Sequence, residues 1–309
     1  QMSNVKWRLV KVDVRWHTLQ EQLRFPAILN RENLDLVHFP YFSVPILYRK
    51  PFVVTIHDLI LHHFPTGEAS TLSPFLYNLK LIGYKFVISN AARKAKKIIT
   101  VSNATKGEIV DHLKVKPSKV VVTYEGIDDK IRSRSNRDEI RNKSKIINTK
   151  TIADKYFLYV GNAYPHKNLD RLLEAFSLLC HPDPDLPGEG SHDIRMVLVG
   201  KEDYFYKRLK EKVKKMNLEK SVLFYGQVSD EELVGLYKNA RALVMPSFME
   251  GFGLPGLEAM ANKCLVLSSN IPSLREVCSD AAIYFDPYNP KDIEEKMKEV
   301  CFNDLNHFS

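Results

Sequence analysis

Two glutamates flank a glycine loop in the segment ALVMPSFMEGFGLPGLEAMA, residues 242–261. The apolar residues before the loop predict a strand, and Pro255 after it is a favoured first residue of a helix. A helix that begins beside glycines offers free N–H groups and a partial positive charge to a phosphate. Glu258, in the first turn, can accept hydrogen bonds from ribose hydroxyls. These residues predict a nucleotide site in which the loop-borne Glu250 faces a sugar ring.

A second strand, glycine turn and helix are expected in YVGNAYPHKNLDRLLEAF, residues 159–176. Gly161 and Asn162 form the turn, and Lys167 lies just before the helix. A cation at this place can neutralise the charge that develops on a departing diphosphate. The alternative is a solvated lysine at a helix start.

Other candidate residues follow apolar runs at expected strand ends. Ligands bind outside the carboxyl ends of the strands in open α/β sheets, so these positions join the candidate site. They are His38, His57 and Asp58 in the first half of the chain, and Gly226 and Gln227 in the second. The two histidines and Asp58 are candidates for binding the sugar or the acceptor. The alternative is that they have only a structural role. Backbone groups of Gly226 and Gln227 can hold a base.

Short apolar runs alternate with amphipathic helical patterns throughout the second half of the chain. This alternation predicts a parallel sheet with helices on both faces, whose strands are apolar throughout because both faces are covered. The expected strands are 156–161, 194–200, 222–226, 242–247, 264–269 and 282–286. The expected helices lie near 168–180, 203–216, 229–239, 255–262 and 272–278, with a last one from about 290.

The first half repeats this pattern less regularly. The polar segment 129–154 lacks apolar periodicity, so it is expected to be a linker that contains a domain boundary. The sequence therefore predicts an α/β protein with two doubly wound, Rossmann-like domains, residues 1–150 and 151–309, that face a crevice. Expected strands in the first half are 6–12, 35–40, 52–59, 97–102 and 120–125, and expected helices are 73–95 and one that begins at Ser102.

The two glycine-loop segments resemble a known family. Glu250, seven intervening residues and Glu258, with the GFGLP loop between them, resemble the E-x7-E element of GT4-type retaining glycosyltransferases. These belong to the glycosyl transferases group 1 family and have the GT-B fold, in which two Rossmann-like domains face a cleft. Residues 161–168 are similar to the family's G-x-x-x-P-x-K-N stretch, although many relatives carry Arg where Asn162 stands.

The resemblance implies a role for each matching residue. Glu250 holds the donor hexose, Glu258 holds the ribose, and Lys167 stabilises the departing diphosphate. His57 lines the cleft near the donor sugar and joins Glu250 and Lys167 as a catalytic candidate. The remaining donor-binding candidates are Gly161 and Asn162, together with backbone groups of Gly251, Phe252, Gly253 and Leu254.

By the same resemblance, a hexose of the mannose or glucose type moves from a GDP- or UDP-linked donor to an acceptor hydroxyl with retention of configuration. The acceptor is a sugar or a lipid-linked molecule, as in the synthesis of surface polysaccharides or glycolipids. Neither a metal nor another cofactor is implied. The family normally begins with further elements, so the first domain is expected to be incomplete and the last helix short.

Three alternatives to a glycosyltransferase differ in the residues they require. A Rossmann oxidoreductase needs GxGxxG directly after its first strand, and the sequence has none. A sugar-nucleotide epimerase of similar shape does not need the loop-borne Glu250. A non-catalytic sugar-nucleotide binder keeps Glu258 and Lys167 and does not turn over.

Charge and cysteine usage narrow the range of partners and compartments. The net charge of +8 suits phosphorylated small molecules or an anionic membrane, because no nucleic-acid-binding motif accompanies it. The segment 74–99 is apolar, aromatic and basic, which indicates either a membrane-docking surface or a core helix with a basic face. Four widely spaced cysteines without CxxC pairing suggest reduced thiols. The expected location is the cytoplasm, with peripheral contact at the inner membrane face.

Overall fold

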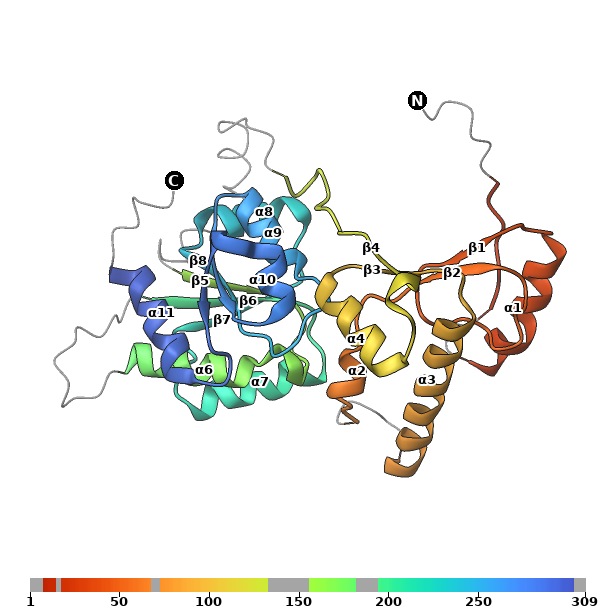
Figure 1. The fold of residues 1–309 in the computed structure, drawn as a ribbon. Helices are drawn as coiled ribbons and strands as arrows, with labels where there is room; N and C mark the ends of the chain where they lie inside the picture. The colour runs from red at the N-terminus through yellow and green to blue at the C-terminus, as the bar shows by residue number, and fades with distance from the viewer. Residues whose placement is uncertain (1–7, 15–17, 68–72, 133–155, 182–193, 303–309) are drawn as a thin grey trace.

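The computed structural model describes residues 8–14, 18–67, 73–132, 156–181 and 194–302. Their helices and strands form two α/β units, each built on a parallel sheet. Figure 1 shows the first unit, residues 18–132, in red to yellow, and the second, residues 156–302, in green to blue. The chain therefore has the two-sheet α/β architecture that the sequence predicts.

The first unit contains a sheet in the simple order β1-β2-β3-β4, with all pairs parallel. Its strands are short, and their apolar side chains pack against the helices. The strands are β1 (Val37–Phe39), β2 (Phe52–Thr55), β3 (Ile98–Thr100) and β4 (Val120–Val122). The helices are α1 (Leu19–Arg31), α2 (Ile60–His63), α3 (Pro74–Lys94) and α4 (Asn103–Leu113), with a 3-10 turn η1 (Pro117–Lys119).

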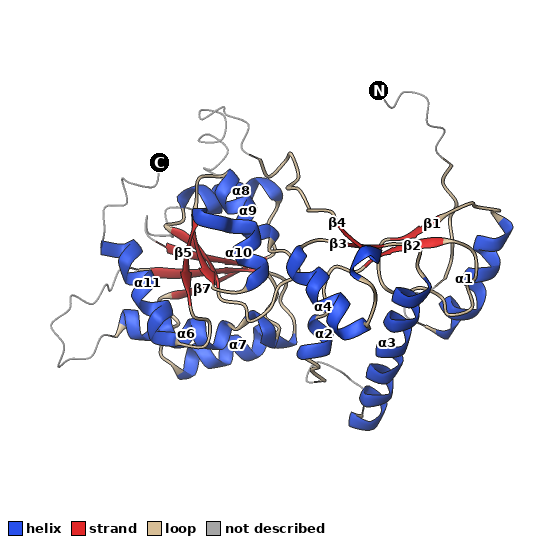
Figure 2. Ribbon diagram, viewed as in Figure 1, coloured by secondary structure: helices blue, strands red, loops and turns tan. Residues whose placement is uncertain are grey.

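The second unit is a parallel sheet in the order β10-β9-β8-β5-β6-β7 with helices on both faces, as Figure 2 shows. Its strands are β5 (Tyr156–Val160), β6 (Arg195–Val199), β7 (Val222–Gly226), β8 (Ala242–Met245), β9 (Leu265–Ser269) and β10 (Ala282–Phe285). Its helices are α6 (Leu169–Cys180), α7 (Tyr204–Lys215), α8 (Asp230–Asn239), α9 (Leu254–Ala261), α10 (Pro272–Cys278) and α11 (Pro290–Phe302). Two 3-10 turns, η2 (Pro165–Lys167) and η3 (Ser279–Ala281), complete it.

The strand order of this second sheet reverses between β5 and β8. From β5 the chain proceeds to β6 and β7 on one side, and β8, β9 and β10 follow on the other side. The loops that follow β5 and β8 run to opposite sides of the sheet, so a crevice forms outside the carboxyl ends of these two strands. Ligands of open α/β sheets bind in such a crevice. The segments that follow β5 and β8 are the two glycine-loop segments found in the sequence.

Several helices start where the sequence provides a capping residue. The Ser102 side chain accepts a hydrogen bond from the Thr105 N–H and so caps α4, as expected from its type. Ser229 and Glu232 form a reciprocal capping box at α8. The helix α9 has Pro255 in its first turn and is preceded by Gly253, whose φ of 103° is left-handed.

Some predicted elements differ from the observed ones. All six expected strands of the second unit are present with ends shifted by a few residues at most. The strand expected at 6–12 is wrong for residues 8–12, which form no strand. Leu9 is 98% exposed there, so this segment has no sheet to pack on. Residues 6 and 7 and most of the expected linker 129–154 lie outside the described residues.

Two helices of the first unit, α1 and α2, were not predicted. Pro26 inside α1 argues against a helix at that place in the sequence, and the four residues of α2 are too few for a helical pattern to show. Among the described residues, no helix is both long and apolar enough to cross a membrane.

Candidate functional site

A cavity of about 1160 Å³ lies between the two units. The second unit contributes the turn after β5 and the loop after β8 to its wall, at the reversal of strand order. The first unit contributes the end of β2, helix α2 and one side of α3. Of the predicted residues, those lining the cavity are His57, Asp58, Asn162, Lys167, Glu250, Gly251, Phe252, Gly253 and Leu254.

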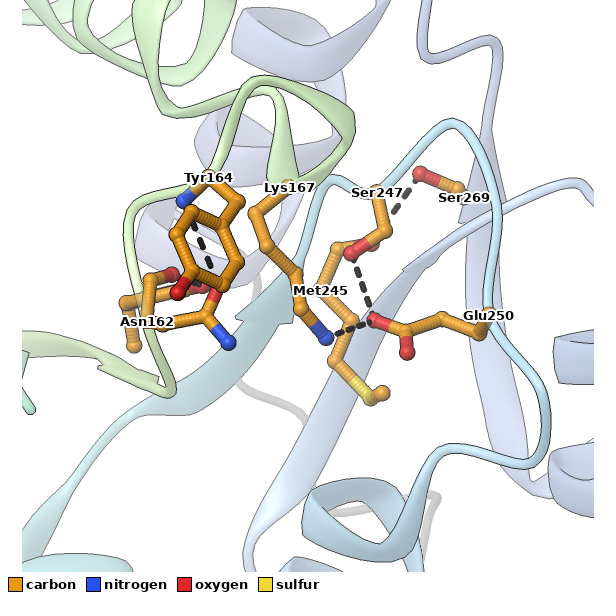
Figure 3. A network of polar contacts seen from close by, with 8 residues as sticks. Asn162, Tyr164, Lys167, Met245, Ser247, Glu250 and Ser269 are labelled. Carbon is orange, nitrogen blue, oxygen red and sulfur yellow. Dashed lines mark hydrogen bonds and ion pairs between the residues drawn. The ribbon is translucent and has the colours of Figure 1, made fainter. Parts of the chain in front are cut away.

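Lys167 and Glu250 both line this cavity, and Figure 3 shows the ion pair that they form. The Lys167 Nζ atom lies 2.7 Å from Glu250 Oε1, and Ser247 Oγ donates to the same oxygen at 2.7 Å. Lys167 ends the 3-10 turn after β5, whereas Ser247 and Glu250 follow β8. The side chains are only 18% and 11% exposed. The structure thus brings together two residues that are far apart in the sequence and were predicted from separate motifs.

The ion pair leaves one carboxylate oxygen of Glu250 available. Both hydrogen bonds reach Oε1, and Oε2 has no hydrogen-bond partner among the described residues. A carboxylate oxygen of this kind can accept a hydrogen bond from a hydroxyl group. Because the pair is mostly shielded from solvent, its charges act on a neighbouring ligand more strongly than they would in water.

The loop that carries Glu250 is fixed against the first unit at Gly251. The Gly251 carbonyl accepts hydrogen bonds from Ser102 Oγ at 2.7 Å and from Thr105 Oγ1 at 3.2 Å. A Cβ atom at this position would lie 2.5 Å from the His57 carbonyl oxygen, so only glycine fits without a shift. The candidate sugar-binding loop therefore touches the first turn of α4 directly.

A second contact between the units lies at the same end of α4. Glu276, on α10 of the second unit, accepts hydrogen bonds from the backbone N–H groups of Asn103 at 2.7 Å and Ala104 at 2.9 Å. The Asn103 amide and the Tyr124 hydroxyl donate to it at 2.8 and 2.9 Å. Burial raises the pKa of Glu276, but the combined effect of these hydrogen bonds is larger and in the opposite direction. The pKa of Glu276 therefore lies below its ordinary value. We call the contacts of Ser102, Asn103, Ala104 and Thr105 with Gly251 and Glu276 the α4 clasp.

His57 and Asp58 line the cavity from the first unit. His57 Nε2 lies 4.0 Å from Glu125 Oε1, and its side chain is 40% exposed. Asp58 Oδ1 accepts a hydrogen bond from the Ile60 N–H at 2.9 Å, which holds the start of α2. Burial raises the pKa of Asp58, the Ile60 hydrogen bond opposes this, and the nearby Glu250 carboxylate raises it further. The two units thus place acidic groups on both walls.

Glu258 lies apart from the cavity wall. It is on α9, and its Oε2 accepts a hydrogen bond from the Tyr237 hydroxyl of α8 at 2.9 Å. Burial raises the pKa of Glu258, and the hydrogen bond from Tyr237 opposes that change. Its role toward a ribose remains a prediction, because the structure places it next to the glycine loop but not on the cavity wall.

The remaining predicted residues also lie away from the cavity wall. His38 Nε2 lies 2.8 Å from Thr55 Oγ1, where the two side chains form a hydrogen bond between neighbouring strands. Gly161 and Gly226 have φ values of 152° and 79°, which favour glycine. Gln227 is exposed. The structure does not bring these four residues to the cavity.

Two residues of the α4 clasp stand out as functional candidates that sequence reasoning missed. Ser102 was predicted only as a helix cap, and Glu276 belongs to no recognised motif. The two contacts join residues separated by 149 and 173 positions in the chain. A local sequence pattern carries no signal for such pairs.

Comparison with known proteins agrees with this geometry. Residues 136–306 match the family model described as Glycosyl transferases group 1, and residues 4–131 match the model described as Glycosyltransferase Family 4. The chain is 27% identical over 285 residues to the O-antigen chain mannosyltransferase RfbU of Salmonella typhimurium. It is 30% identical over 253 residues to the O-antigen chain mannosyltransferase B of Escherichia coli.

These alignments cover 92% and 82% of the chain, and 70% and 61% of the two relatives. Among solved structures, Anabaena Alr3699/HepE in complex with UDP-glucose has a TM-score of 0.70 at 18% identity. That match covers 93% of this chain and 75% of the other. The likeness is one of fold, and together with the two parallel-sheet units it confirms the predicted GT-B architecture.

Proposed function

The chain belongs to the glycosyl transferases group 1 family, and from this premise we propose that it transfers a hexose from a nucleoside diphosphate to an acceptor hydroxyl. The O-antigen mannosyltransferase relatives support a hexosyltransferase of surface polysaccharide synthesis. The observation that carries the proposal is the Lys167–Glu250 pair, which lies in an interdomain cavity at the reversal of strand order.

We infer a role for each charged group of the pair from its surroundings. Negative charge develops on the diphosphate as the bond to the sugar breaks, and Lys167 stabilises it together with the partial positive charge at the start of α9. The unpartnered Oε2 of Glu250 accepts a hydrogen bond from a hexose hydroxyl and orients the ring. The sugar gains oxocarbenium character, as at glycosidic centres generally.

Retention and independence of a metal belong to the same proposal. The departing phosphate takes the proton of the acceptor hydroxyl, which attacks from the face that the phosphate leaves. This route requires no protein carboxylate as a nucleophile. The anomeric configuration of the product, read from its NMR coupling constants, tests it, and an inverted product would contradict it.

For the donor, we propose GDP-mannose first, because both aligned relatives are named as mannosyltransferases. A UDP-hexose is the second candidate, because a structure of similar fold holds UDP-glucose. Each donor is to be incubated with the chain and a bacterial lipid extract as acceptor, while release of the nucleoside diphosphate is measured. Release should exceed that of a Glu250→Gln variant.

The same assay separates the alternatives. A non-catalytic binder would bind a nucleoside diphosphate and release none from its sugar-linked form. An epimerase would convert the sugar of the donor without releasing diphosphate. Either result for every donor would overturn the transferase proposal.

We propose that the acceptor is lipid-linked and that α3 approaches an anionic membrane at the inner face. One side of α3 lines the cavity, and its other residues include an exposed apolar set beside Lys80 and Lys85. The exposed residues are Phe75, Leu76, Leu79, Ile82 and Phe86. Apolar and basic groups together suit an anionic lipid surface.

Vesicle sedimentation tests this contact. The chain should sediment with vesicles that contain anionic lipid, and an Ile82→Ser variant should sediment less. Leu23→Ser is the matched control, because Leu23 is 66% exposed on α1 and does not line the cavity. Equal sedimentation of all three proteins would contradict the proposed role of α3.

A further inference from the structure

Three potential metal-binding side chains converge where α2 ends beside α4. His63 is the last residue of α2, and Glu108 and His112 lie one turn apart on α4. His63 Nε2 lies 2.6 Å and His112 Nε2 lies 3.3 Å from the same carboxylate oxygen, Glu108 Oε2. The three candidate ligand atoms all lie within 4.8 Å of one another.

The ligand types and their spacing suit a divalent transition metal. Zinc binds imidazole nitrogen and carboxylate oxygen at about 2.0–2.2 Å, so ligand atoms around one tetrahedral ion lie roughly 3.3 Å apart. The 3.3 Å separation of His112 Nε2 from Glu108 Oε2 equals this value, whereas His63 Nε2, at 2.6 Å, has to move outward to admit the ion. Two imidazoles and a carboxylate favour zinc-like ions over magnesium or calcium, which prefer oxygen ligands.

Among the described residues, the group of potential ligands consists of these three side chains, and all three are partly exposed. The three side chains are 34%, 34% and 42% exposed, so solvent reaches the point where they meet and water can occupy a fourth position. The neighbouring His62 is turned to α3, where its Nδ1 lies 3.0 Å from the Tyr84 hydroxyl.

We propose that His63, Glu108 and His112 form a binding site for one divalent transition metal ion of the zinc type. An ion held there ties the end of α2 to α4. His112 lies about two helical turns beyond Thr105, so the ion and the α4 clasp hold the same helix at different levels.

Fixing α2 has a consequence for the cavity. Ile60 and Leu61 of α2, and Phe64 just after it, line the cavity on the side of the first unit. The start of α2 is already held by Asp58, and the metal would hold its other end. The ion therefore fixes the cavity wall through its ligands and takes no part in the transfer step proposed above.

The test is titration of the chelator-treated full chain with Zn²⁺ alone. The chain should bind about one Zn²⁺, and its thermal midpoint should rise because the ion binds the folded state. His112→Ala and Glu108→Gln should each weaken binding by at least about tenfold and abolish the rise. His181→Ala, which removes an exposed histidine of the second unit, should bind as the unaltered chain does.

Co²⁺ provides a second readout that does not depend on folding stability. Its visible absorption bands should show a site of low coordination number with nitrogen ligands in the unaltered chain, and they should be lost in His112→Ala. Equal binding of Zn²⁺ by the unaltered chain and by His112→Ala would overturn the proposal, as would a lack of binding. Neither measurement involves a sugar donor, so failure here is distinct from failure of the transferase proposal.

Discussion

Lys167 and Glu250 neutralise one another in the cavity wall, while one oxygen of Glu250 has no hydrogen-bond partner in the part of the chain that the structure describes. The lysine in this pair has two roles. It compensates the charge of a carboxylate that is mostly shielded from solvent, and it is the cation that faces a departing diphosphate in the proposed reaction. Asn162 cannot share this second role, because its side chain is neutral and accepts a hydrogen bond from the Tyr164 N–H.

We predict that Lys167→Ala lowers the turnover number by about 10²–10³-fold, which is the cost of removing one group that stabilises transition-state charge. Lys167→Arg should retain part of the activity, because the charge remains. The measurement is the rate of nucleoside diphosphate release at a saturating donor concentration. Lys220→Ala, which alters an exposed lysine before β7, is the control. Turnover of Lys167→Ala equal to that of the control would contradict this role.

At the scale of elements, the glycine loop depends on close contact with a neighbouring strand end. A Cβ atom at Gly251 would collide with the His57 backbone oxygen, whereas one at Gly107 on α4 would meet nothing within 4 Å. We predict that Gly251→Ala destabilises the fold by about 1–3 kcal/mol, as overpacking does, and reduces activity. Gly107→Ala should be neutral or stabilising by up to about 1 kcal/mol.

Thermal unfolding of the two variants checks this prediction. A thermal midpoint for Gly251→Ala as high as that of Gly107→Ala would show that the loop moves away from the strand end at no cost. The contact at His57 would then not determine where the loop lies.

The elements of the second unit were predictable because each strand is a short apolar run followed by a regular helical pattern. Lys167 and Glu250 were predictable for the same reason, since each lies in a local strand, loop and helix motif. The strand expected at 6–12 was wrong for residues 8–12, because apolar residues such as Leu9 find no sheet to pack against there. Ser102 and Glu276 were missed because their contacts exist only after the two units come together.

At the scale of the whole molecule, the α4 clasp holds the two units around the cavity. The Glu276 carboxylate accepts four hydrogen bonds from the first unit, three of them from the first turn of α4. A negative charge at this end of a helix is also favoured by the helix dipole. The clasp therefore stabilises the arrangement in which Glu250 and His57 share one cavity.

We predict that Glu276→Ala shifts the molecule toward a more open arrangement with a larger radius of gyration in small-angle X-ray scattering. Glu231→Ala, on the exposed side of α8, is the control.

Because the pKa of Glu276 is lowered in the closed form, the clasp is fully present above the ordinary glutamate pKa and is lost as the pH falls through the lowered value. The radius of gyration of the unaltered chain should therefore increase in acid. Equal radii of gyration for Glu276→Ala and Glu231→Ala at neutral pH would contradict the role of the clasp.

The contact between Ser102 and Gly251 also constrains how such proteins can be recombined. The hydroxyl of one unit recognises a backbone carbonyl in the loop of the other, and Glu276 recognises bare N–H groups. In the first unit, these contacts involve the side chains of Ser102, Asn103, Thr105 and Tyr124 as well as the backbone at the start of α4. A donor unit taken from a relative should therefore assemble on this first unit when it carries a glutamate at position 276 and glycine at position 251, however different the rest of its surface is.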